Sequence, residues 1–191
     1  SQGVTATSKG KAVTGDIAVT GMFCHGVYAT GGGEVTVNGG VLASGENAKG
    51  VYFERDDSAL AGTATVNGDV EAEAEGIYIL GGSVYVTGDV KSRDSYGVRV
   101  SGGQIVIDGE IDAPSYLDIA GSDRNKDSED SIDSNGYWIY NGYEGSLVKV
   151  GNGVGGGLPA VTTTMIDPME ITRTGVRLRG SVTSNGGSAV T

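Results

Sequence analysis

The sequence predicts an all-β fold made of stacked repeats, and three observations carry this prediction. Short runs of alternating apolar residues recur along the chain, and a period of two is typical of strands. Glycine-marked corners return about every 21 residues over much of residues 1–111. The apolar residues of successive repeats also fall into the same columns. No amphipathic helical stretch longer than one or two turns is visible.

Each repeat begins and ends with a glycine. The opening glycines are 21 to 26 residues apart, and they are Gly26, Gly50, Gly76 and Gly97. The closing glycines precede Val or Ile by two positions and are 20 to 29 residues apart: Gly15, Gly39, Gly68, Gly88 and Gly109. The longest repeat holds a charged insertion at 54–58. Most strands end at a glycine or at an Asn-Gly or Asp-Gly step, and these residues tolerate tight corners.

Three strands per repeat are expected to point the same columns inward. The first strand gives Val27/Val51/Ile77/Val98, the second gives Val35/Ala64/Val84/Ile105, and the third gives Val41/Val70/Val90/Ile111. Such coils cannot bury their inner faces alone, so neighbours stack at about 4.8 Å. A β-sandwich would not keep columns in register over four repeats. We therefore expect residues 1–150 to form a parallel β-helix of about five three-strand coils with terminal caps, right-handed by analogy.

The two ends of this solenoid depart from the repeat. The first coil is degraded, and alignment places Lys11 in the inward column of Val35 and Val84. After Ile111 the pattern breaks, and a polar stretch at 121–135 precedes a cluster of aromatic residues: Tyr137, Trp138, Tyr140 and Tyr143. We expect these aromatics to plug the end of the core in a last, imperfect coil. The alternative is an aromatic platform for a ligand.

Composition excludes several classes of protein. The 191 residues include 35 glycines without a Gly-X-Y period, which argues against collagen, and 13 Lys and Arg against 24 Asp and Glu give a net charge of −11. An acidic surface disfavours nucleic acid. No run of 18 apolar residues exists, so we expect no membrane insertion. The single cysteine, Cys24, falls in a small inward column and is expected to be a buried packing residue.

The outward columns are where a binding function would lie. One column contains Tyr28, Tyr52, Tyr78 and Arg99. Stacked aromatic side chains on adjacent coils stabilise a sheet. The same rings could instead bind sugar rings, with Arg99 and the hydroxyls donating hydrogen bonds. A second column of His25, Lys49, Glu75 and Tyr96 is varied, and we expect it to be solvated surface.

The polar stretch offers a candidate calcium site. Asp123, Asn125 and Asp127 have the spacing with which an EF-hand-type calcium loop begins, and Asp130 is a possible fourth ligand. The match then fails, because Ser128 stands at position six and Ser134 at position twelve. A solvated acidic loop is the favoured interpretation, and apart from possible calcium we expect no cofactor.

The stacked three-strand coils resemble the pectin-lyase-like β-helix superfamily, many members of which cleave acidic polysaccharides. The resemblance implies clustered carboxylates, or calcium-binding Asp with a basic Arg, on one outer face. Cys24-His25-Gly26 is similar to the G-H-G of polygalacturonase-type hydrolases, but the first glycine is missing. No N-T-D, D-D or R-I-K partner motif is present. We therefore expect no enzyme, and polysaccharide cleavage is the weakest hypothesis.

The C-terminal part begins with a glycine-rich linker at 151–158. Residues 159–191 then resemble the opening of a bacterial fibronectin type III module, on Pro159, the strand at 161–163, the alternating run at 175–182 and the turn at 184–187. Two strands of a seven-strand sandwich cannot form a core. We expect a fragment whose orphan strands pair with a sheet edge, including self-association between copies through residues 159–191.

β-Helix repeats followed by a fibronectin-type module resemble long extracellular proteins of bacteria. The first hypothesis is therefore a non-enzymatic structural or adhesion segment of a larger secreted or cell-surface protein. The alternative is a carbohydrate-binding module that uses the outward tyrosine column. The expected partners are a polysaccharide or another surface protein.

Overall fold

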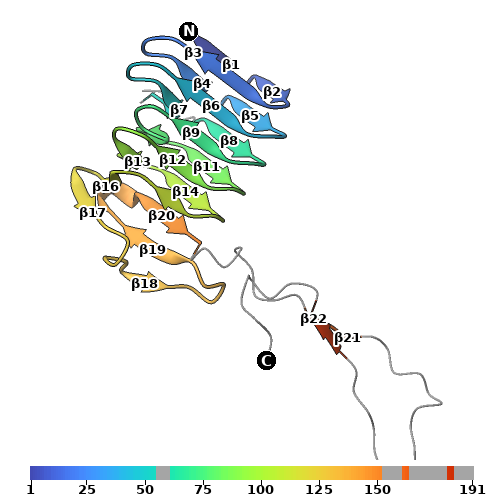
Figure 1. Ribbon diagram of the computed structural model, residues 1–191, viewed down its shortest axis with the longest axis vertical. Helices are drawn as coiled ribbons and strands as arrows, with labels where there is room; N and C mark the ends of the chain where they lie inside the picture. The colour runs from blue at the N-terminus through green and yellow to red at the C-terminus, as the bar shows by residue number, and fades with distance from the viewer. Residues whose placement is uncertain (55–60, 152–160, 164–179, 183–191) are drawn as a thin grey trace, which may run out of the picture.

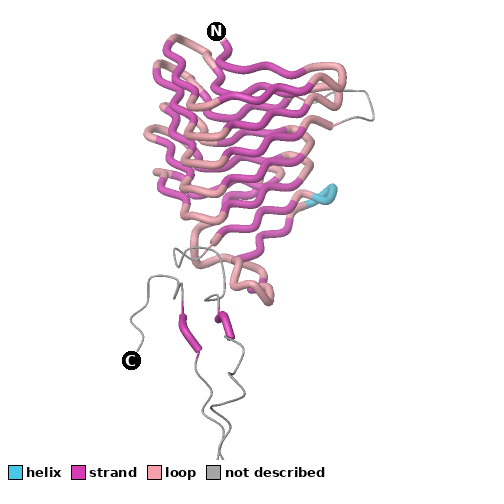
Figure 2. The backbone as a smooth tube through the Cα atoms, turned by 90° about the vertical axis from the view of Figure 1, so that its right-hand side faces the viewer, coloured by secondary structure: helices cyan, strands magenta, loops and turns pink. Residues whose placement is uncertain are grey.

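The structure, a computed structural model, describes residues 1–54, 61–151, 161–163 and 180–182. Within residues 1–151 the chain winds into a β-solenoid of about five turns, and each turn contributes one strand to each of three parallel sheets. The turns stack one above another with their corners aligned (Figures 1 and 2). The predicted all-β parallel β-helix is confirmed.

The first sheet carries the first strand of every turn. In spatial order, sheet A contains β1 (Gln2–Ala6), β4 (His25–Ala29), β7 (Lys49–Phe53), β10 (Ile77–Ile79), β13 (Tyr96–Val100), β16 (Ser115–Ile119) and β17 (Ser122–Arg124). Only the last pair, β16 with β17, is antiparallel within this sheet.

The other two sheets carry the second and third strands. In spatial order, sheet B contains β2 (Lys11–Thr14), β5 (Glu34–Val37), β8 (Thr63–Val66), β11 (Ser83–Val86), β14 (Gln104–Ile107), β20 (Leu147–Val150), β19 (Trp138–Asn141) and β18 (Ser131–Ile132). Sheet C contains β3 (Ile17–Thr20), β6 (Val41–Ser44), β9 (Val70–Ala72), β12 (Val90–Ser92) and β15 (Ile111–Asp112).

The predicted inward columns form the core in the predicted register. Val51 pairs with Ile77 and Ile77 with Val98, and the valines of the other two sheets follow the same rule. The core residues from Val27 to Val150 form one continuous cluster, and most of them are fully buried. Four small residues, Cys24, Ala43, Ala48 and Ala72, form a second cluster at the corner between sheets C and A.

The opening glycines are required by close packing between sheets C and A. A Cβ atom on Gly76 would lie 2.5 Å from Cγ1 of Val90 and 2.7 Å from the carbonyl oxygen of Gly97. Gly26, Gly50 and Gly97 meet the equivalent branched side chains of their own turns. No other residue type fits without displacing the backbone or the core.

The closing Gly-Asp pair forms a ladder of hydrogen bonds at another corner. The carboxylate of Asp69 accepts from the backbone N–H of Asp89 at 2.9 Å, and Asp89 accepts from the N–H of Glu110 at 3.0 Å. The glycine before each donating N–H lies against the same carboxylate, so that a Cβ on Gly88 would collide with Oδ1 of Asp69. Each aspartate of this step therefore joins its turn to the next, and the ladder is interrupted at Gly40, which has no carboxylate.

A sixth, interrupted turn closes the C-terminal end. Strands β16 and β20 continue sheets A and B in parallel, but residues 120–146 leave the solenoid between them. This excursion contains β17, β18, β19 and the 3-10 turn η1 (Tyr143–Gly145), and its strands pair antiparallel with the last turns. Tyr140 is fully buried in the core cluster, so the expected aromatic plug is confirmed for that residue.

The first turn differs from the prediction by one residue. Lys11 pairs with Glu34 on the outer face, where their side chains form an ion pair of 2.7 Å. Ala12 occupies the inward column, opposite Val35. The expectation that Lys11 points inward was wrong, because a one-residue slip exchanges the two faces of a strand.

The C-terminal segment contains one described pair of strands. β21 (Val161–Thr163) and β22 (Gly180–Val182) are antiparallel, with Val161 opposite Val182. The rest of the predicted linker and fibronectin-like segment, and most of the insertion at 54–58, lie outside the described residues. In the part of the chain that the structure describes, no helix is long and apolar enough to cross a membrane.

Candidate functional site

The outer face of sheet A gathers the predicted ligand-binding residues into a row. Tyr28 pairs with Tyr52, Tyr52 with Tyr78, and Tyr78 with Arg99, so the four stand on consecutive strands from β4 to β13. Asp118 on β16 continues the row next to Arg99. Register alone therefore brings these side chains together.

The tyrosine rings pack against one another within the row. The ring centroids of Tyr28 and Tyr52 are 6.0 Å apart and those of Tyr52 and Tyr78 are 5.6 Å apart, with the planes tilted by 34° and 44°. The guanidinium of Arg99 lies 5.2 Å from the centroid of Tyr78. The hydroxyl of Tyr28 donates to Glu54 at 2.9 Å. Neighbouring rings and a cation thus cover much of the aromatic surface.

An ionic chain runs beside the tyrosines. Lys49 contacts Glu75 at 3.2 Å, Arg99 contacts the same carboxylate at 3.8 Å, and Arg99 Nε donates to Asp118 at 3.1 Å. Glu75 and Asp118 are both buried. Four alternating charges on four turns compensate one another, which is what buried charges require.

The column of His25, Lys49, Glu75 and Tyr96 is therefore not the solvated surface that the sequence suggested. His25 packs on Tyr52 with their centroids 4.6 Å apart, and its Nδ1 is buried without a hydrogen-bond partner. Burial, followed by the positive charge of Lys49, lowers the pKa of His25 below its ordinary value. The sequence shows which residues share the column but not how closely opposite charges on adjacent turns approach.

The four calcium candidates lie on the excursion and have other partners. Asp123 accepts from the hydroxyl of Tyr96 at 2.7 Å, and Asn125 accepts from the N–H of Asp127 at 3.0 Å. Asp130 accepts from the N–H of Asn141 and contacts Arg124 at 3.5 Å. Among the described residues no three Asp, Glu, His or Cys side chains are grouped to hold a metal ion. Calcium binding stays a prediction for measurement in solution.

Cys24, beside His25 in the hydrolase-like tripeptide, is fully buried, as its column indicated. Its thiol points toward the carbonyl oxygen of Ser44, 3.7 Å away. A residue in this position packs the corner between sheets C and A, next to Ala43 and Ala48.

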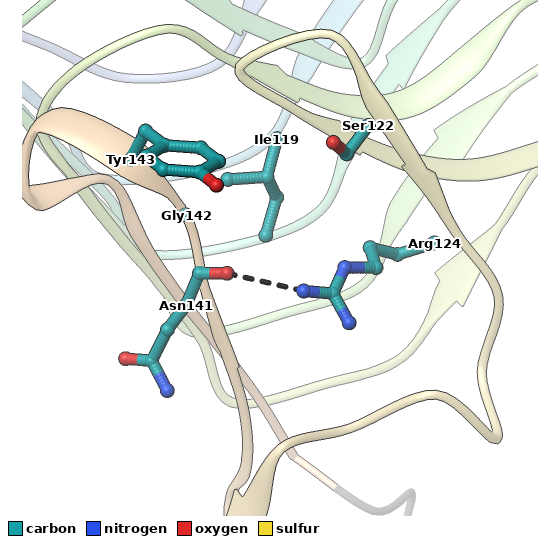
Figure 3. Close-up of a pocket in the computed structure, with 6 residues that line it drawn as sticks. All are labelled: Ile119, Ser122, Arg124, Asn141, Gly142 and Tyr143. Atoms are coloured by element: carbon teal, nitrogen blue, oxygen red, sulfur yellow. Dashed lines mark hydrogen bonds between the residues drawn. The ribbon is translucent and has the colours of Figure 1, made fainter.

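A pocket that the sequence did not predict lies at the C-terminal end of the solenoid. The pocket has a cavity volume of about 230 Å³ and is lined by Ile119, Ser122, Arg124, Asn141, Gly142 and Tyr143. The Tyr143 ring lies on one side, Ser122 and Arg124 lie on the other, and Ile119 is between them (Figure 3). The only sequence signal was the aromatic cluster itself, because the pocket forms between segments that leave the repeat.

Comparison with known proteins gives no matching family model, no similar curated protein and no similar solved structure. Two surfaces of the molecule carry features that bear on function: the outer face of sheet A and the C-terminal excursion. The first has the features of an interlocking surface, in which tyrosines and charges contact their equivalents on adjacent turns. The second presents an open pocket with an exposed aromatic ring.

Proposed function

We propose that this chain is a non-enzymatic structural segment of a larger extracellular bacterial protein, at the cell surface or secreted, where it separates or displays other domains or takes part in adhesion. The proposal includes a pectin-lyase-like architecture for the β-helix and the start of a fibronectin type III-like module at 159–191. It also includes self-association of copies through strands in residues 159–191.

The observation that supports the proposal is the use of outward side chains to join turns. On sheet A, where a substrate or ligand could be bound, Tyr52 packs against Tyr28 and Tyr78, and Glu75 is held by Lys49 and Arg99. Interactions that repeat from turn to turn stabilise a solenoid along its whole length. Such a surface favours a rigid spacer over a catalytic groove.

A carbohydrate-binding module is the second candidate, and the register of Tyr28, Tyr52, Tyr78 and Arg99 favours it. Amphipathic rings at regular spacing with a cation at one end suit a polysaccharide. The ligand would have to compete with the ring-to-ring and cation contacts already present.

One variant separates the two candidates. Changing Tyr28, Tyr52 and Tyr78 together to Ser removes the ladder, and each lost pair contributes roughly 0.2–1 kcal/mol. For a structural ladder, the free energy of unfolding in urea falls by about 0.4–2 kcal/mol for the two pairs, while binding on a glycan array is the same as for the wild type. Glycan binding by the wild type that disappears in a folded triple variant would favour the module instead.

A further inference from the structure

We propose that the C-terminal pocket, the cavity lined by Ile119, Ser122, Arg124, Asn141, Gly142 and Tyr143, binds one neutral pyranose ring. The site is distinct from the tyrosine row on sheet A and goes beyond the structural role proposed above.

The pocket lies on a segment that the repeat does not explain. Residues 120–146 interrupt the sixth turn, and the structure places the β16–β17 turn next to the end of β19. Insertions carried by a rigid scaffold are where binding residues concentrate. A simple cap would need only to cover the core, which Tyr140 already does.

Tyr143 makes no evident contribution to the fold. Its side chain is 82% exposed, on a short 3-10 turn between Gly142 and Ser146. Within the described residues its hydroxyl makes no hydrogen bond. A large exposed ring beside a cavity is the usual platform for the apolar face of a sugar, and Ile119 supplies the apolar floor.

The remaining lining groups suit hydroxyls that both donate and accept. Within the described residues the Ser122 hydroxyl and the Arg124 Nε–H have no hydrogen-bond partner, whereas the Asn141 side chain points away from the cavity and only its backbone carbonyl faces Arg124 (Figure 3). The Nη atoms of Arg124 make only long contacts, 3.3 Å to the carbonyl of Ser128, 3.4 Å to that of Asn141 and 3.5 Å to the carboxylate of Asp130. With the Tyr143 hydroxyl, these groups provide two or more donors and at least two acceptors around one cavity.

The volume of the pocket and the charge around it limit the class of ligand that can bind. Pockets for drug-sized ligands are usually about 300–1,000 Å³, so a cavity of about 230 Å³ suits a single ring rather than an extended chain. Asp130 contacts Arg124 at 3.5 Å, and Asp123 and Asp127 lie on the same excursion. This acidic surrounding disfavours carboxylated or sulfated sugars, so the expected ligand is neutral.

Saturation-transfer-difference NMR on the full chain tests the site. The probes are methyl α-glucopyranoside, methyl β-galactopyranoside, glucuronic acid and the open-chain alcohol sorbitol. We expect at least one neutral pyranoside to bind with an affinity in the millimolar range, as for a single ring in an open pocket. Glucuronic acid and sorbitol should bind more weakly.

Variants locate the binding. Tyr143→Ala should abolish saturation transfer and Tyr143→Phe should weaken it by a few fold, with unchanged melting temperatures because the side chain is exposed. Phe23→Ala, which removes an exposed aromatic ring from the corner before β4, far from the excursion, is the control and should bind as the wild type. The proposal is overturned if no neutral pyranoside binds at tens of millimolar, if glucuronic acid binds best, or if binding survives Tyr143→Ala. None of these outcomes affects the structural role of sheet A.

Discussion

The glycines of this chain serve different purposes that can be told apart residue by residue. Gly76 lies where a Cβ would meet Val90 and the backbone of the next turn, whereas a Cβ on Gly81, at the following corner, would meet nothing within 4 Å. Only the first kind is dictated by packing. The second provides conformational freedom at a corner that other residues can also form.

This difference predicts a large effect on stability for one glycine-to-alanine change and a small effect for another. Gly76→Ala should lower the free energy of unfolding by about 1–3 kcal/mol, as overpacking does in other cores. Gly81→Ala should change it by less than about 1 kcal/mol, because alanine loses less backbone entropy on folding. Urea denaturation of the two variants measures both values. Equal effects would mean that the corner between sheets C and A can relax and that the opening glycine is not required.

Among the residues singled out from the sequence, His25 has the environment that was predicted least well. Its pKa is lowered by burial, then by Lys49 and by the N-terminal amine, while Glu75 acts in the opposite direction. The unfolded chain therefore binds more protons than the folded chain just below the ordinary pKa of about 6.5. The stability contributed by neutral His25 is present above that pH and is lost as the pH falls.

A comparison of the wild type with His25→Asn isolates this effect. Between pH values of about 8 and 5.5, the stability of the wild type relative to the variant should decrease, because only the wild type must protonate a half-buried imidazole. Chemical denaturation at several pH values measures the difference, and the carboxylates shared by both proteins cancel. A difference that does not vary with pH would contradict the lowered pKa.

At the scale of elements, the carboxylate of Asp108 is one of the groups that join the C-terminal excursion to sheet B. The hydroxyls of Tyr85 on β11 and of Tyr137, just before β19, both donate to Asp108, which follows β14. The bond to Asp108, with some burial, raises the pKa of Tyr85 to about 12. Three segments that are distant in sequence are thus joined at one point.

Asp108→Asn should loosen this junction. The pKa of Tyr85 should fall toward its ordinary value of about 10, and the free energy of unfolding near neutral pH should fall by about 1 kcal/mol, a value reduced for solvent screening. In the wild type, the stabilisation of protonated Tyr85 is present below about pH 10 and is lost as the pH rises toward 12. Ultraviolet titration of tyrosinate in the folded protein reports the pKa. Asp112→Asn, at an exposed position, is the control and should leave both quantities unchanged.

For the whole molecule, the regular turns could be predicted from sequence in register, whereas the ends could be predicted only in outline. The inward columns that contain Ile77, Val84 and Val90 recur from turn to turn because each turn meets the same neighbours. One sequence pattern therefore specifies many contacts. Lys11 was misplaced because the first turn has weak alternation, with Ala12 inward and Val13 71% exposed.

The sixth turn was expected as a last, imperfect coil, but its strands could not be placed, for a different reason. The excursion at 120–146 separates β16 from β20, so the second half of that turn no longer follows the first at repeat spacing. The pocket beside Tyr143 depends on antiparallel pairings within this excursion, and no repeat specifies them. Sequence periodicity predicts the contacts that recur from turn to turn, but it does not predict the contacts that are made only once.

If the fold depends on nearest-neighbour turns, removing one whole turn should leave a folded protein. Deletion of residues 76–96 joins Glu75 to Gly97, so Gly97 takes the place of Gly76 and Val98 meets Val51 where Ile77 did. Each inward column loses one member but keeps its register. We expect a cooperative thermal transition followed by circular dichroism, with a lower melting temperature because one interface between turns is lost.

A deletion of half a turn is the matched control. Removing residues 76–85 shortens the chain less but deletes β10 and all of β11 except Val86, so that Glu75 is joined directly to Val86 and inward and outward columns no longer align across sheets A and B. A shift out of register exposes apolar side chains and buries polar ones. This shorter deletion should therefore unfold the solenoid although the longer one does not. If both variants fold, or if only the half-turn variant does, stability does not come from stacked equivalent turns.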